Sequence, residues 1–149
     1  MQERFETFTV LINRISRNIR KIKNHEMADY QLRSAHISIL YYLYVQDGLT
    51  ATDLCERCEE DKATISRAIE FLEDKGYITG EAKGQKRYKS AMYLTELGRE
   101  VGRKIAKKIN FVLDEMNADL TEEERQAFYK GLAVISKRLD LIANSDIPE

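Results

Sequence analysis

The sequence predicts a mainly α-helical protein that carries one small β-hairpin. Three observations support this fold class. Apolar residues recur at the three- and four-residue spacing of an α-helix over most of the chain. Two short β-prone runs, residues 77–80 and 88–94, interrupt that spacing and flank a polar segment. Glycines and helix-capping residues fall between the periodic runs, where helices are expected to begin and end.

A central helix is expected between Asp61, a capping residue, and Gly76, which can stop a helix. Apolar residues at i, i+4 and i+7 give it one buried face: Ile65, Ile69 and Leu72. At about 100° per residue, the opposite face and its flanks carry small, charged and hydrogen-bonding residues. The residues predicted to contact DNA there are Lys62, Ala63, Thr64, Ser66 and Arg67. Such a first turn suits a helix that enters a DNA groove by its N-terminus.

The segments around this helix complete a known supersecondary motif. A helix is expected over residues 32–45, and Thr50 can cap a short helix over residues 51–57. Residues 59–60 form a tight link to the central helix, which gives a helix-turn-helix. The β-hairpin that follows makes the predicted module, residues 31–94, a winged helix-turn-helix. A run of four cations and no acid extends from its tip into its second β-prone segment, between residues 83 and 89: Lys83, Lys86, Arg87 and Lys89. Such a run favours contact with phosphate.

The two ends of the chain are predicted to form a helical dimerisation region, residues 1–30 and 95–149. Helices are expected over residues 3–23, after Thr95, and after Thr121, where Thr and Glu124 make a capping box. The terminal helices have apolar residues that alternate at three and four, a heptad seam that requires a partner helix. The predicted dimerisation residues are Phe5, Phe8, Ile12, Ile15, Phe128, Leu132, Ile135 and Leu139. A homodimer is therefore expected.

Composition limits the alternatives. The 149 residues are 33% charged and 43% apolar, as in a soluble globular protein. No apolar run approaches the ~20 residues that span a bilayer, so no membrane partner is expected and the cytoplasm is the default location. The net charge of −1 does not itself favour nucleic acid. No nucleophile–base set and no metal-ligand cluster is recognisable, so neither an enzyme nor a cofactor is predicted.

Four segments together resemble the MarR (multiple antibiotic resistance regulator) family. They are Leu54–Arg57, Lys62–Arg67, Leu72–Ile78 and Leu94–Arg99. The resemblance covers nearly the whole chain. It implies a dimeric transcriptional regulator, usually a repressor, that binds a pseudo-palindromic operator in double-stranded DNA. It also implies a small-molecule effector, or thiol oxidation, that releases the DNA. The family's wing typically reads Asp-x-Arg, whereas here Gln85 replaces the acid two residues before Arg87.

Two alternatives stay open on the sequence. The winged helix could be a protein-interaction module, although an interface core is usually depleted of charge and this module is cationic. Cys55 and Cys58, the only two cysteines, could form a thiol-based redox switch. Their interpretation as buried structural residues is preferred, because a free cysteine in a core behaves as a small hydrophobe. At single-residue level, Arg67 could pair with Glu70 rather than contact DNA.

Overall fold

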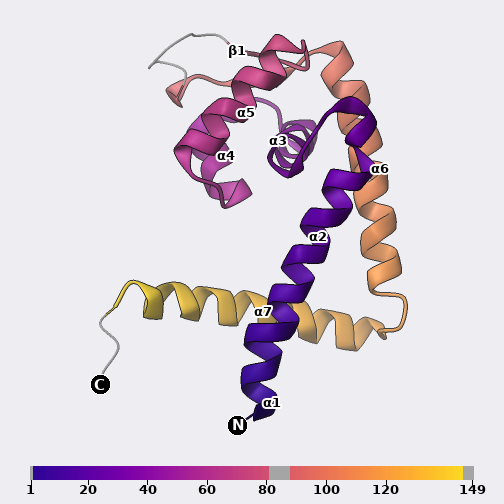
Figure 1. Ribbon diagram of the computed structural model, residues 1–149, viewed down its shortest axis with the longest axis vertical. Helices are drawn as coiled ribbons and strands as arrows, with labels where there is room; N and C mark the ends of the chain where they lie inside the picture. Colours follow the sequence, from indigo (N-terminus) through magenta and orange to yellow (C-terminus); the bar gives the residue numbers. More distant parts are fainter. Residues whose placement is uncertain (1, 81–87, 146–149) are drawn as a thin grey trace. The chain divides into compact units, whose positions relative to one another are not determined.

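The computed structural model describes residues 2–80 and 88–145 of the chain, which divides into two compact units, residues 1–107 and 108–149. The fold is mainly helical with a two-stranded hairpin (Figure 1), which confirms the predicted fold class. In order, the elements are α1 (Gln2–Phe5), η1 (Glu6–Leu11), α2 (Ile12–Glu26), η2 (Ala28–Tyr30), α3 (Ser34–Val45), α4 (Ala51–Cys58), α5 (Lys62–Asp74), β1 (Ile78–Gly80), β2 (Met92–Leu94), α6 (Glu96–Met116) and α7 (Glu122–Ala143).

The first three elements form one continuous rod at the N-terminus of the chain (Figure 1). The backbone stays right-handed helical at both junctions, and η1 is a wider π-helical stretch between two α-helical ones. In this stretch the Thr7 hydroxyl donates to the Glu3 carbonyl at 2.9 Å and the Thr9 hydroxyl donates to the Phe5 carbonyl at 2.6 Å. The rod begins at Gln2 and ends at Glu26, so it is slightly longer than the predicted helix over residues 3–23.

The core of the first unit lies between α3, α4, α5, the hairpin and the first half of α6. Its fully buried side chains are Leu32, Ile39, Leu40, Leu43, Leu54, Ile65, Ile69, Leu72, Met92, Val101 and Ile105. Burial of each large aliphatic side chain stabilises the fold by about 1.5–3 kcal/mol. The three apolar residues predicted to form the inner face of the central helix all belong to this core.

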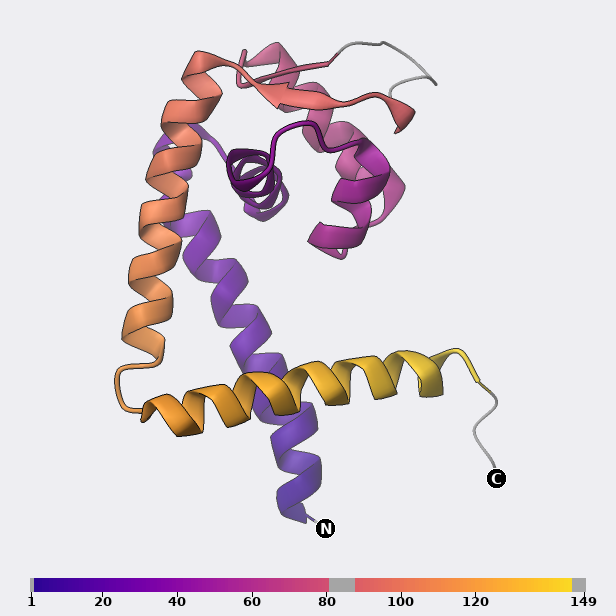
Figure 2. The same ribbon diagram turned by 180° about the vertical axis from the view of Figure 1, so that it is seen from behind.

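The hairpin is antiparallel, with Ile78 opposite Leu94 and Gly80 opposite Met92. Figure 2 shows it running beside the helix-turn-helix. Leu49, in the loop before α4, adds a bridge to Met92, and Met92 N donates to the Leu49 carbonyl at 2.9 Å. The second strand is shorter than the predicted run over residues 88–94, because Tyr88 instead turns towards α4 and α5. Residues 81–87, which include the predicted hairpin tip, lie outside the described residues.

Helix α6 begins as predicted at Thr95, whose hydroxyl accepts the Gly98 N–H at 3.0 Å. Leu97 has the helical spacing of the buried Val101 and Ile105, which predicts an inward side chain, but it is 48% exposed. The buried stripe instead passes through Gly98, Val101, Gly102 and Ile105. This difference arises because the helix approaches the Tyr77 carbonyl so closely that glycine faces inward there.

The second unit contains the end of α6, a short turn and α7. The predicted capping box is present, since Thr121 Oγ1 accepts the Glu124 N–H at 3.2 Å and the Glu124 carboxylate accepts the Thr121 N–H at 2.8 Å. At the turn, the largely buried Asn117 side chain donates to the Leu113 carbonyl and to the Tyr129 hydroxyl, both at 2.7 Å. These bonds fix the start of the turn that connects α6 to α7.

Candidate nucleic-acid interface

The helix-turn-helix is held by side-chain caps at the start of both helices. Thr50 caps α4, and its hydroxyl accepts the Asp53 N–H at 3.2 Å. The connecting turn contains Glu59 in the left-handed conformation, at φ 52°. Asp61 then caps α5, where its carboxylate accepts the Thr64 N–H at 2.7 Å. That bond, with a second from the Thr64 hydroxyl, lowers the pKa of Asp61, so the cap stays ionised.

The first two turns of α5 present the predicted face. Lys62, Ala63 and Arg67 are exposed, and Thr64 and Ser66 on the flanks are partly exposed. This distribution confirms the orientation deduced from helical periodicity. The contact of these five residues with DNA stays a prediction.

A short chain of hydrogen bonds orders the polar side chains on this face. The Arg67 guanidinium donates to Thr64 Oγ1 at 3.4 Å, and the Thr64 hydroxyl donates to Asp61 Oδ2 at 3.0 Å. The bond from Arg67 to the neutral Thr64 hydroxyl is long and uses one of the five N–H donors of the guanidinium, so it orients the side chain without occupying its whole set of donors. A guanidinium has the geometry to donate to a base edge or a phosphate.

Tyr88 is a site residue that the sequence did not single out. Its hydroxyl donates to the Lys62 carbonyl at 3.3 Å, and the Lys62 ammonium lies over its ring, 4.1 Å from the centroid. Its own carbonyl accepts the Thr52 hydroxyl at 3.3 Å. An aromatic residue within the cationic run was the available signal, but strand propensity accounted for it equally well.

The cationic run itself is only partly described. Lys89 follows Tyr88 in a short helical turn and is exposed. Lys83, Lys86 and Arg87 lie outside the described residues, and their predicted contacts with DNA stay predictions.

The two cysteines lie in the first helix of the motif, where both are partly exposed rather than buried as predicted, and Cys58 is the more buried of the two. Burial raises the pKa of Cys58 to about 11, although the nearby Lys23 ammonium opposes the shift. Burial also raises the pKa of Cys55. Lys23 reaches this region from α2, where its ammonium donates to Ser38 Oγ at 3.0 Å. Both thiols are therefore protonated at neutral pH, the form that reacts poorly with oxidants.

We expect the thiols of the native protein to react more slowly with a disulfide reagent or iodoacetamide than those of the unfolded chain. For Cys58, a pKa of about 11 in place of 9.0 lowers the thiolate fraction at neutral pH by about a hundredfold. Reaction rates in buffer and in urea would measure this, and Cys58→Ser would assign the slower phase. A native thiol that reacts as fast as the unfolded one would contradict the structural interpretation and revive the redox alternative.

His36 connects the start of α3 to the central helix. Its ring stacks on Phe71 of α5 with centroids 4.4 Å apart and planes 16° apart. Its Nδ1 accepts the Arg33 N–H at 3.0 Å, which satisfies an amide at the start of α3. Burial, followed by the charge of Arg33, lowers the pKa of His36. The folded protein therefore favours the neutral imidazole.

We expect the free energy of unfolding to decrease as the pH is lowered, because of His36. Since its pKa is lower in the folded than in the unfolded chain, this stabilisation is complete above about 6.5, the unfolded value. It is lost as the pH falls through the folded value. Urea titrations between about pH 7.5 and about pH 5.5 would measure the slope. His36→Asn, whose amide oxygen can still accept the Arg33 N–H, should reduce it. An equal slope in the variant would contradict the assignment.

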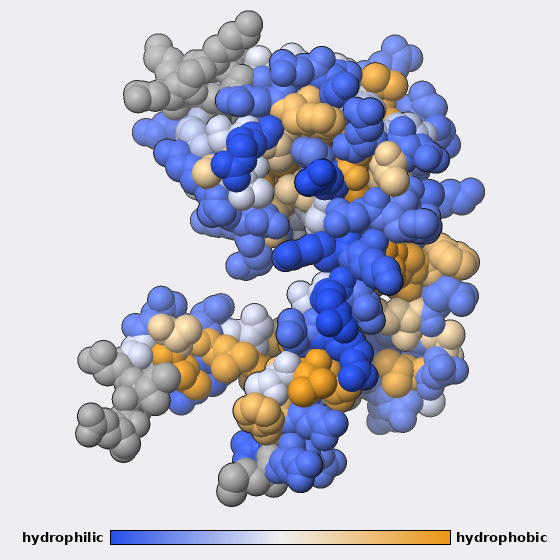
Figure 3. All heavy atoms as spheres, in the orientation of Figure 1, coloured by the Kyte–Doolittle hydropathy of each residue, from blue (hydrophilic) through white to orange (hydrophobic). Residues whose placement is uncertain are grey.

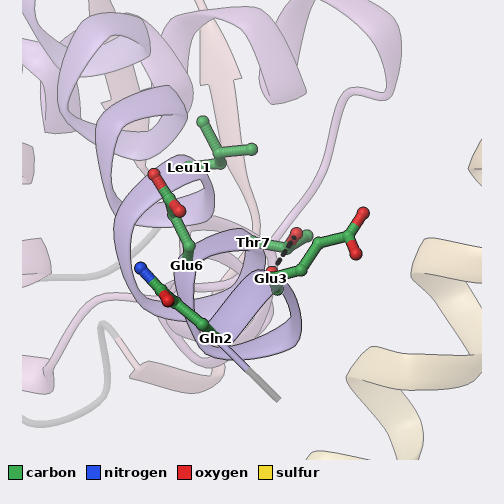
Figure 4. A pocket seen from close by; sticks show the side chains of 5 residues that line it. All are labelled: Gln2, Glu3, Glu6, Thr7 and Leu11. Atoms are coloured by element: carbon green, nitrogen blue, oxygen red, sulfur yellow. Dashed lines mark hydrogen bonds between the residues drawn. The ribbon is translucent and has the colours of Figure 1, made fainter.

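A shallow hollow of about 490 Å³ lies at the start of the N-terminal rod. Figure 4 shows that its lining side chains, Gln2, Glu3, Glu6, Thr7 and Leu11, all come from one stretch of helix. Two carboxylates and no enclosing second element make this a surface groove.

The geometry defines a class of protein: a helix-turn-helix with a polar, ordered exposed face, followed by an antiparallel hairpin, is a winged helix-turn-helix DNA-binding module. Comparison with known proteins narrows the class. The MarR family model matches residues 30–87. A MarR-family transcriptional regulator from Silicibacter pomeroyi is 31% identical, with a TM-score of 0.73 over 92% of this chain and 90% of its own. The chain belongs to the MarR family of transcriptional regulators.

Two further proteins are similar, one in sequence and one in fold. YwoH of Bacillus subtilis, an uncharacterised HTH-type transcriptional regulator, is 26% identical over 78% of this chain and 85% of its own length. The MepR chain in the S. aureus MepR–DNA complex is 22% identical in sequence and has the same fold. Its TM-score is 0.78 over 89% of this chain and 97% of the MepR chain. Within residues 2–80 and 88–145, no helix has the length and apolar character needed to cross a membrane.

Proposed function

We propose that the protein is a homodimeric repressor that binds a pseudo-palindromic operator through residues 31–94. The observation that carries this proposal is the exposed face of α5. There a charged cap, Asp61, orders the Thr64 hydroxyl, which in turn accepts a bond from Arg67. A face with this chemistry at the N-terminus of the second helix is suited to base edges in the major groove.

The homodimer is supported by apolar side chains that the single chain leaves exposed at both ends. On the N-terminal rod, Phe5 is 68% exposed and Ile15 is 49% exposed. On α7, Phe128 is 44% exposed and Leu139 is 53% exposed. Figure 3 shows hydrophobic side chains along each of these elements, taken separately. Because these residues repeat at heptad spacing, we assign residues 1–30 and 95–149 to dimerisation with a second copy.

A dimer places two copies of α5 on one face of DNA. Recognition helices of such dimers enter successive major grooves about 34–36 Å apart, and the wings reach flanking minor grooves. An effector that favoured a different distance between the helices would release the DNA by a population shift.

Selection of duplexes from a random pool, followed by gel-shift titration, tests the proposal. We expect a selected sequence with two-fold symmetry and half-sites about 10–10.5 bp apart. Retardation without sequence preference at low salt would instead favour the protein-interaction module. Repression would then be tested by placing the selected sequence over a reporter promoter, where activation in place of repression would overturn that part of the proposal.

The dimer is tested by introducing a charge into the seam. Leu132→Glu should produce a monomer in sedimentation equilibrium and lose binding to the symmetric duplex, because a carboxylate would be buried in the interface. Lys137→Glu is the matched control, since it introduces the same group on the same helix, away from the seam. A monomeric wild-type protein, or a seam variant that remains dimeric, would overturn the assignment.

A further inference from the structure

We propose that Tyr88 is a positioning residue for DNA binding, which holds the Lys62 side chain at the N-terminus of the recognition helix, α5. This inference rests on the proposed DNA-binding function. It adds a residue that lies outside α5 and outside the predicted set of contacts.

Tyr88 is hydrogen-bonded to both helices of the helix-turn-helix. From α4, the Thr52 hydroxyl donates to its carbonyl at 3.3 Å, which fixes the backbone. The Tyr88 hydroxyl donates to the Lys62 carbonyl at 3.3 Å, which fixes the ring against the first turn of α5. The ring is therefore restrained at two points, and its face is set by the helix-turn-helix rather than by the hairpin strands.

The restrained ring in turn restrains a cation. The Lys62 ammonium lies 4.1 Å from the ring centroid, well inside the roughly 6 Å over which a ring face attracts a cation. A free lysine side chain has several rotatable bonds, and ordering it at a phosphate costs conformational entropy. Because Tyr88 already restricts Lys62 before binding, less of that entropy is lost when DNA arrives. The ammonium remains exposed, since Lys62 is an exposed residue at the start of α5.

The two contacts of the ring can be separated by substitution. Tyr88→Phe keeps the ring face and removes the bond to the Lys62 carbonyl, whereas Tyr88→Leu removes both. Loss of an exposed cation–ring contact corresponds to an effect of about three- to fivefold on affinity. We therefore expect Tyr88→Leu to weaken binding by that factor and Tyr88→Phe to weaken it less.

A double-mutant cycle between Lys62 and Tyr88 distinguishes positioning from a merely structural role. Affinities of wild type, Lys62→Gln, Tyr88→Leu and the double variant would be titrated against the duplex selected by the wild-type protein, at several salt concentrations. Lys62→Gln should reduce the salt slope by about one in the wild-type background. In the Tyr88→Leu background it should have a clearly smaller effect on affinity, with a coupling factor of about three.

The controls make each outcome decisive. Urea unfolding and stoichiometric titration report the folded, active fraction of every variant, and Tyr93→Leu removes another exposed aromatic side chain, from β2, as a control. A merely structural role would lower the active fraction and leave the Lys62 effect intact. Independent effects of the two substitutions, or wild-type affinity in Tyr88→Leu, would overturn the inference. Failure of the wild-type protein to select any duplex would instead overturn the proposed function.

Discussion

Replacement of Arg67 by alanine is expected to reduce affinity for the selected operator by about 1–3 kcal/mol, or roughly five- to 150-fold. Arg67 is exposed in the second turn of α5, where its guanidinium is oriented by the Thr64 hydroxyl. A guanidinium held in this way can present two parallel donors to the acceptors of a guanine. The loss should therefore be concentrated at one base pair of each half-site and should be much smaller on unrelated DNA.

Titrations against the selected duplex and against single-base variants of it would measure this effect. Lys75→Ala is the matched control, because it removes one cation from the opposite end of the same helix. Arg67→Lys keeps the charge but lacks the fork of donors, so it should recover affinity for unrelated DNA more than discrimination. An equal loss on every duplex would show that Arg67 contacts phosphate, and no loss would leave the pairing with Glu70 as its role.

The orientation of the recognition helix was predictable because one periodicity decided it. Ile65, Ile69 and Leu72 lie on one face at helical spacing, and the structure buries all three. The caps were predictable for a similar reason, since Asp61 and Thr121 act on amides only three residues away. Local sequence is sufficient wherever the interaction itself is local.

Tyr88 shows where that reasoning stops. Its partners Thr52 and Lys62 are 36 and 26 residues distant in sequence, and no periodic pattern connects them. Strand propensity favoured an extended residue at 88, but tertiary contacts with two helices outweighed it. The contacts of Tyr88 with α4 and α5 thus explain both the position of its ring and the shortness of the second strand. Such a contact becomes apparent only when the fold brings the segments together.

Gly98 is a second residue whose role depends on a distant segment. It lies in the first turn of α6, where sequence alone would treat a glycine as a slightly unfavourable helix residue. In the fold, a Cβ at this position would lie 1.8 Å from the Tyr77 carbonyl oxygen and 3.3 Å from Leu94 Cδ2. That carbonyl cannot easily move, because it accepts the Thr95 N–H at 3.0 Å and the Thr95 hydroxyl at 3.2 Å.

Gly98→Ala is therefore expected to destabilise the protein by about 3 kcal/mol or more, at the upper end of the range for overpacking. Urea unfolding followed by far-ultraviolet circular dichroism would measure the change. Gly131→Ala in α7 is the matched control, since its added Cβ would meet nothing within 4 Å. There the methyl group should be neutral or stabilise by up to about 1 kcal/mol, because alanine favours a helix more than glycine does.

The two glycine substitutions add the same methyl group to a helix, so their difference isolates the close approach of α6 to the hairpin. If Gly98→Ala unfolded at the same urea concentration as the wild type, α6 would have to leave the Tyr77 carbonyl at little cost. The joint between the hairpin and α6 would then be compliant. A large loss would instead show that α6 and the hairpin pack too closely at this point to admit a methyl group.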